Sequence, residues 1–186
     1  MSISTNAADG PLPASGGYSA TAKAFHWTVA VLVIVLIAVG VGREFMPKGP
    51  EKDLVTMLHK ATGIVVLGLM LARLAYRIGH RPPPPEPGQP VWKIGLSHAV
   101  HWALYLIVIV MPILGWLGSN ALGRPVSMYG LFDLPTLIGE NKDLGETIYD
   151  IHGLLGFTAL GLIVVHAGAA LHHHFVLRDA VLKRMT

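Results

Sequence analysis

Four long apolar stretches divide this chain, and polar segments rich in proline, glycine and charged residues separate them. The stretches run near residues 22–45, 53–78, 95–118 and 146–175, and a helix needs about 20 residues to cross a bilayer. The first is almost unbroken, and a helix that is apolar on all sides must be surrounded by lipid or by protein. The pattern predicts an all-α fold, an integral membrane four-helix bundle.

The composition agrees with lipid as the main solvent. Hydrophobic residues make up 52% of the chain and charged residues 13%, whereas soluble domains carry about 25% charged residues. Residues 1–17 are polar and lack the basic-then-apolar order of a signal peptide. We therefore expect a mobile polar tail at 1–17 and a single membrane domain at 18–186. The chain has no cysteine, which excludes disulfides and iron–sulfur ligation, and its net charge of +3 does not indicate nucleic acid.

Basic residues gather on one side of the predicted bundle. They flank the loop between the second and third stretches and follow the fourth stretch: Arg73, Arg77, Arg81, Lys93, Arg178, Lys183 and Arg184. The long loop on the other side, 119–145, has only Arg124 and Lys142, although the short first loop is also basic. Because basic loops stay inside the cell, we expect both termini in the cytoplasm.

Four histidines fall inside the apolar stretches, where ionisable residues are costly and usually functional. His26 opens the first stretch, His59 opens the second, and His152 and His166 lie on the fourth. Because successive helices run in opposite directions, His26 and His166 share the cytoplasmic depth, and His59 and His152 share the outer depth. His152 and His166 are 14 residues apart, nearly four helical turns, so both face the same way.

Paired histidines on facing helices can bind a haem through both axial positions, or bind a metal directly. A zinc site normally takes three or four protein ligands, whereas each depth here offers two. Single histidines near helix ends are more often interfacial, but pairing by depth favours ligation. We expect two b haems stacked across the bilayer, one on His26 and His166 and the other on His59 and His152.

Further histidines cluster at the cytoplasmic ends of the third and fourth stretches: His98, His101, His172, His173 and His174. Most are expected to be interfacial, but histidine can pass protons near neutral pH, as quinone reduction requires. We select His173 and His101 as candidate catalytic proton donors, since His173 lies nearly two turns beyond His166.

Short motifs recur in order along the helices. They are Tyr18-Ser19, Phe25-His26-Trp27, Met57-Leu58-His59, Ser97-His98-x-x-His101, Asp150-Ile151-His152-Gly153 and the run from Val165-His166 to His172-His173-His174. From residue 18 to the C-terminus this set resembles the bacterial cytochrome b561 family. The resemblance implies a multi-pass di-haem b protein of the bacterial inner membrane, with ligands at His26, His59, His152 and His166. It also implies electron exchange with quinone and, for some members, superoxide oxidation outside with quinone reduction inside.

The leading interpretation is transmembrane electron transfer from an outer-face donor, a small molecule or a protein, to quinone, with ubiquinone the expected acceptor. With superoxide as donor the protein is an oxidoreductase; otherwise it is an electron carrier. One alternative is a cytochrome b relay subunit for a protein or dehydrogenase partner, and a metal transporter or structural membrane protein is the alternative outside redox chemistry. The 119–145 loop is net acidic, so an anionic donor requires a local basic patch around Lys60, Arg43 or Arg124. We expect this loop to cover the outer haem.

Overall fold

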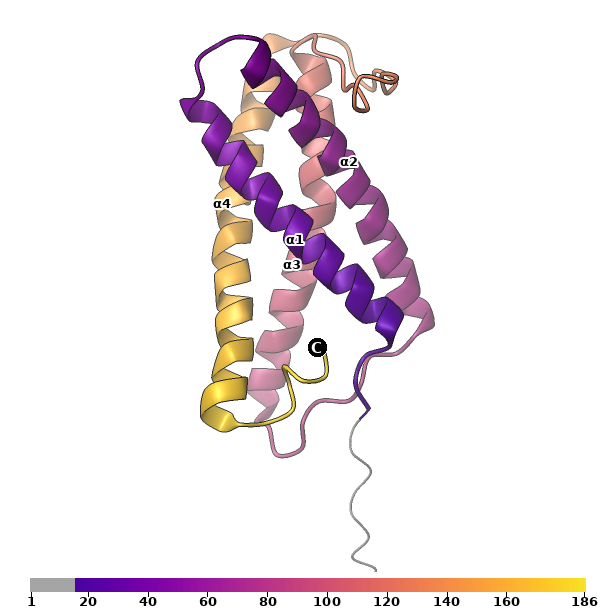
Figure 1. Cartoon of the computed structure of the whole chain (residues 1–186), viewed down its shortest axis with the longest axis vertical. Coiled ribbons are helices and arrows are strands. Elements are labelled where there is room, and N and C mark those ends of the chain that lie inside the picture. Colours follow the sequence, from indigo (N-terminus) through magenta and orange to yellow (C-terminus); the bar gives the residue numbers. More distant parts are fainter. Residues whose placement is uncertain (1–15) are drawn as a thin grey trace, which may run out of the picture.

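The structure, a computed structural model, describes residues 16–186 and contains four long helices (Figure 1). They are α1 (Ala20–Gly42), α2 (Pro50–Gly79), α3 (Val91–Ala121) and α4 (Lys142–His172). A 3₁₀ turn, Arg43–Phe45, follows α1, and a π-helical turn, His173–Leu177, follows α4. All four helices are long and apolar enough to cross a membrane. The predicted all-α membrane bundle is confirmed; residues 1–15 of the expected polar tail lie outside the described part of the chain.

Local capping explains where several helices begin. The Ser19 hydroxyl accepts a hydrogen bond from the Ala22 amide at 3.2 Å, and the Asn141 side chain accepts one from the Leu144 amide at 3.0 Å. Pro50 occupies the first turn of α2, where its missing N–H has no helical partner to lose. Asn141 thus starts α4 before the apolar stretch begins, and α3 likewise extends beyond its apolar stretch at both ends.

The helices pack in sequence order. α1 packs on α2, α2 on α3, and α3 on α4, while α4 makes no extensive contact with α1 or α2 within residues 16–186. A small core joins the first three helices through Val29 and Val33, Val66 and Met70, and Tyr105. Large apolar side chains cover much of the outer surface, as expected for a bundle whose solvent is lipid. The helix that carries two of the candidate histidines is therefore attached mainly through α3.

Glycines allow α3 and α4 to approach closely. A Cβ placed on Gly118 would lie 2.9 Å from Ile148 Cγ2, and one on Gly145 would lie 2.6 Å from Leu122 Cδ2. Small residues serve in the same way at many membrane-helix interfaces. This contact holds α4 near the end of the bundle where α3 finishes.

The 122–141 loop lies over that end of the bundle (Figure 1). Tyr129 OH lies 3.2 Å from Thr62 Oγ1 of α2, and Trp116 Nε1 donates to the Pro135 carbonyl at 3.2 Å. The Asn120 side chain, on a residue that is 4% exposed, accepts a hydrogen bond from the Leu137 amide at 2.9 Å. The loop is therefore held against α2 and α3 at several points.

At the opposite end, the C-terminal segment folds back toward the start of α1 (Figure 1). Arg184 donates to the Pro84 carbonyl at 2.6 Å and pairs with Glu86 at 2.9 Å, which attaches the segment to the α2–α3 loop. Trp27 Nε1 donates to the Met185 carbonyl at 2.8 Å. The C-terminal segment thus joins the start of α1 to the α2–α3 loop.

Candidate functional site

The structure brings the four membrane histidines together as two pairs. His26 on α1 and His166 on α4 have ring centroids 6.1 Å apart with planes at 74°. His59 on α2 and His152 on α4 have centroids 6.3 Å apart with planes at 66°. The pairs are those expected from depth, and each spans α4 and a helix on which α4 does not pack extensively.

The separation within each pair suits two ligands on opposite sides of one metal ion. A bond from a metal ion to an imidazole nitrogen is about 2 Å long, which puts the centroids of two opposed rings about 6 Å apart. Within residues 16–186 no group of three or more His, Asp or Glu side chains is arranged to hold a metal ion. Each pair therefore offers two protein ligands, as bis-histidine ligation of haem requires.

An open apolar groove of roughly 290 Å³ lies between α1 and α4 and is lined by Ile34, Ile37, Ala38, Val41 and Leu160. It shows that the surface between the two helices is apolar. The fit to haem rests on the donor set of the two pairs.

Glycines lie against the His59–His152 pair, called the outer pair below after its expected side of the membrane. A Cβ on Gly40 of α1 would lie 3.2 Å from His59 Cε1, and a Cβ on Gly115 of α3 would lie 3.4 Å from His152 Cε1. Nδ1 of His152 donates to the Met111 carbonyl at 3.1 Å, since that oxygen can only accept. Its Nε2 therefore keeps a free lone pair, which is the tautomer that a metal ligand needs.

His101 is a third histidine beside the His26–His166 pair, called the inner pair below after its expected side of the membrane. Its ring centroid is 5.1 Å from that of His166, and its Nδ1 donates to the Ser97 carbonyl at 2.6 Å. The candidate proton donor on α3 therefore does lie beside the inner pair.

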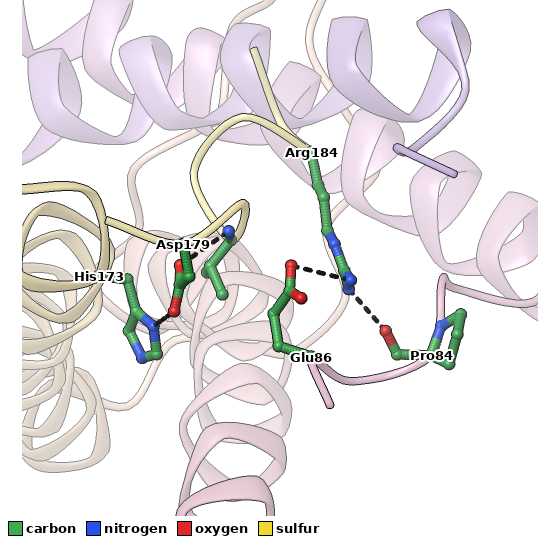
Figure 2. A network of polar contacts seen from close by, with 6 residues as sticks. Pro84, Glu86, His173, Asp179 and Arg184 are labelled. Carbon is green, nitrogen blue, oxygen red and sulfur yellow. Dashed lines mark hydrogen bonds and ion pairs between the residues drawn. The ribbon is translucent and has the colours of Figure 1, made fainter. Parts of the chain in front are cut away.

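His173 opens the π-helical turn that follows α4 and is held by an acidic partner (Figure 2). Its Nδ1 is 2.5 Å from Asp179 Oδ2. Burial alone would raise the pKa of Asp179, but the hydrogen bonds from His173 and the Val181 amide, with the charge of Arg184, lower it below its usual value. Sequence reasoning missed Asp179, because only the folded-back tail brings it to His173.

A basic group lies beside the outer pair. Lys60 Nζ donates to Ser119 Oγ at 2.9 Å and to the Pro125 carbonyl at 2.8 Å. Arg43 lies close enough for its charge to act on both His59 and His152, and Arg43 and Arg124 both act on Lys60. The basic residues proposed from sequence therefore converge at the end of the bundle that carries His59 and His152.

Comparison with known proteins gives a consistent result. A family model described as prokaryotic cytochrome b561 matches residues 17–186. The chain is 32% identical to cytochrome b561 homolog 2 of Escherichia coli (strain K12), over 90% of each chain. It is 34% identical to the probable superoxide oxidase CybB of Yersinia pestis, over 90% of this chain and 94% of that one. Cytochrome b561 homolog 1 of Escherichia coli (strain K12) is 30% identical, over 90% and 96%. The chain belongs to the prokaryotic cytochrome b561 family, bacterial membrane proteins that use haem b to transfer electrons.

Proposed function

We propose that this protein carries electrons across the bacterial inner membrane from a donor at the outer face to a quinone at the cytoplasmic face. The proposal rests on the two histidine pairs. In each pair the ring centroids are about 6 Å apart, and each pair joins α4 to α1 or to α2. His26 and His166 hold one haem b, and His59 and His152 hold the second. Bound in this way, the haems supply one-electron chemistry, while the protein sets their position and surroundings.

Each pair would give a bound haem iron two imidazole ligands from the protein, an arrangement that suits electron transfer. α4 contributes one ligand at each depth, so it sets the spacing between the two sites. Close packing on α3 at Gly118 and Gly145 holds α4 in position within the bundle.

The proposed orientation puts the His26 and His166 pair, both termini and the α2–α3 loop on the cytoplasmic side. The support is the basic content of that loop and of the C-terminal segment. An alkaline phosphatase domain fused after Thr186 should be inactive in this orientation. An active fusion would show that the C-terminus and the His26–His166 pair lie on the outer side instead.

Superoxide is the proposed donor. It is an anion, and a positive potential at a site mouth speeds the capture of anions. Arg43, Lys60 and Arg124 lie beside the outer pair; Arg43 pairs with Glu44 at 3.3 Å and Asp133 acts on Lys60, so the three cations outnumber these two carboxylates by one. One relative is named a probable superoxide oxidase. A basic protein donor docking on the acidic 122–141 loop is the second candidate.

Ubiquinone is the proposed acceptor, near the inner pair. Reduction of a quinone takes up protons as well as electrons, and histidine exchanges protons near neutral pH. His101 lies beside His166, and His173 with Asp179 lies nearer the C-terminal segment. We assign His101 to proton delivery at the quinone and His173 to proton entry from the cytoplasm.

The test uses proteoliposomes that contain the haem-loaded protein and ubiquinone, with superoxide generated outside. We expect quinone reduction that slows in Arg43→Gln, with little change in Lys48→Gln, an exposed residue of the same loop. His101→Ala should slow haem reoxidation by quinone and keep both haem spectra, while His98→Ala, at the same exposed helix end, should not. Haem reduction by a basic protein donor but not by superoxide would favour the second candidate.

A further inference from the structure

Two arginines stand one helical turn apart on α2 beside the inner histidine pair. The guanidinium carbon of Arg73 lies 5.1 Å from the ring centroid of Tyr105 on α3. That of Arg77 lies 5.5 Å from the same ring and 5.6 Å from the ring of Trp102. The aromatic rings hold both guanidinium groups toward α3, and both arginine side chains are half-buried.

Neither arginine has a carboxylate partner within residues 16–186. The ion pairs there engage Arg43, Lys142, His173 and Arg184 instead. Contacts with aromatic faces replace only part of the hydration free energy that a cation loses when it leaves water. A charge withdrawn from water is usually paired, so these two half-buried cations are placed to bind an anion from outside the polypeptide.

Arg73 also contacts a proposed haem ligand. One of its terminal nitrogens lies 3.1 Å from Nδ1 of His26. Arginine can only donate, so Nδ1 of His26 accepts this hydrogen bond. A neutral histidine that binds a metal through Nε2 carries its proton on Nδ1 and donates it. The two arrangements exclude each other, so Arg73 must take a different acceptor when His26 binds iron.

We propose that Arg73 and Arg77 bind a propionate carboxylate of the haem held by His26 and His166. The proposal rests on the proposed function, because it requires a haem at that pair. Arginine is suited to the task, since its planar fork matches a carboxylate with two parallel hydrogen bonds. The carboxylate satisfies both cations and gives Arg73 the acceptor that His26 no longer provides. A lipid phosphate offers the same anionic oxygens and is separated from the propionate by the test.

The test measures how the midpoint potential of the inner haem depends on pH. Each protein is loaded with haem b or with its dimethyl ester, in which the propionates cannot ionise. The variants are Arg73→Gln, Arg77→Gln and the control Arg81→Gln, an exposed residue just beyond α2. Without an arginine partner the carboxylate titrates nearer neutral pH, and its ionisation favours oxidised iron.

We expect the potential in Arg73→Gln to fall more steeply with rising pH than in the unmodified protein, and the added slope to vanish with the ester. Arg81→Gln should match the unmodified protein in both forms. Tyr18, Tyr105, His101 and Arg77 also face Arg73, but esterification leaves them unchanged, so the ester isolates the carboxylate.

Two results would overturn the inference: unchanged slopes in both Arg73→Gln and Arg77→Gln, or an added slope that persists in the ester. A lipid phosphate as the bound anion would give the first of these. Arg77→Gln keeps the test decisive if Arg73→Gln does not fold. Failure of the proposed function is separate, since the unmodified protein would then show no haem that depends on His166.

Discussion

Gly40 offers the sharpest test of the outer site, because replacing it disturbs a proposed ligand and little else. A Cβ at this position would lie 3.2 Å from His59 Cε1 and 3.8 Å from its Nδ1. The first distance is shorter than ordinary van der Waals contact, and valine adds two further methyl groups. Gly40→Val must therefore push the His59 ring away from its seat.

The size of the effect follows from overpacking. Extra methyl groups in a packed site cost about 1–3 kcal/mol, and each 1.4 kcal/mol is about a factor of ten in affinity. We expect the outer haem to bind about 5- to 150-fold more weakly in Gly40→Val. The helix itself should not suffer, because valine is a better helix former than glycine by about 0.3 kcal/mol.

The assay is haem content and reduced spectrum after titration of the purified protein with haem. Gly68→Val is the matched control, since nothing lies within 4 Å of a Cβ at that exposed position of α2. Gly115→Ala, whose Cβ meets His152 at 3.4 Å, should keep both haems. Equal binding of two haems by Gly40→Val and by the unmodified protein would refute the reasoning, as would loss of the inner haem instead of the outer.

Three further perturbations have definite expected outcomes. Ser119→Ala removes an acceptor of Lys60 from a fully buried position, which should cost about 1–3 kcal/mol and speed hydrogen exchange in the 122–141 loop; unchanged exchange would contradict it. Gly118→Val forces a Cβ to within 2.9 Å of Ile148 and should lower the free energy of unfolding by about 1–3 kcal/mol in thermal denaturation. Because the pKa of Asp179 is lowered, its contact with His173 is kept at every pH above the ordinary pKa of 3.8 and is lost only as the pH falls through the lowered pKa. Hydrogen exchange of the C-terminal segment should therefore rise only in strong acid, and loosening near neutral pH would count against this contact.

The transmembrane helices and the pairing of the histidines could be predicted from the sequence, because both depend on local regularities. About 20 apolar residues are needed to span a bilayer, and alternating helix direction fixes depth. The 14-residue spacing of His152 and His166 places them on one face of a helix without any knowledge of packing.

The surroundings of the histidines could not be predicted in this way. Whether His101 faces His166 depends on the rotation of α3, which packing against α2 and α4 decides. Arg73 was interpreted only as a marker of orientation, and its contact with His26 depends on the crossing of α1 and α2. The Asp179 partner of His173 depends on a tail that folds back on itself, for which the sequence carries no periodic signal.

The observed helix ends differ from the ends of the apolar stretches for a similar reason. The apolar stretches mark where side chains meet lipid, whereas helices end where backbone groups find caps. α4 starts at Lys142 because Asn141 caps it, and α3 starts at Val91 after Pro90. Gly123, with φ of +67°, follows the end of α3, and a side chain there would also meet the Glu140 carboxylate.

The central claim is that two depth-separated histidine pairs each hold one haem b. Haem quantitation with redox titration of the unmodified protein, His166→Ala and His152→Ala tests it directly. We predict two b haems per chain in the unmodified protein and one in each variant. The haem left in His166→Ala and the haem left in His152→Ala should have different midpoint potentials, and the sum of their two titration curves should match the curve of the unmodified protein. A single haem per chain in the unmodified protein, or the same remaining haem in both variants, would contradict the claim.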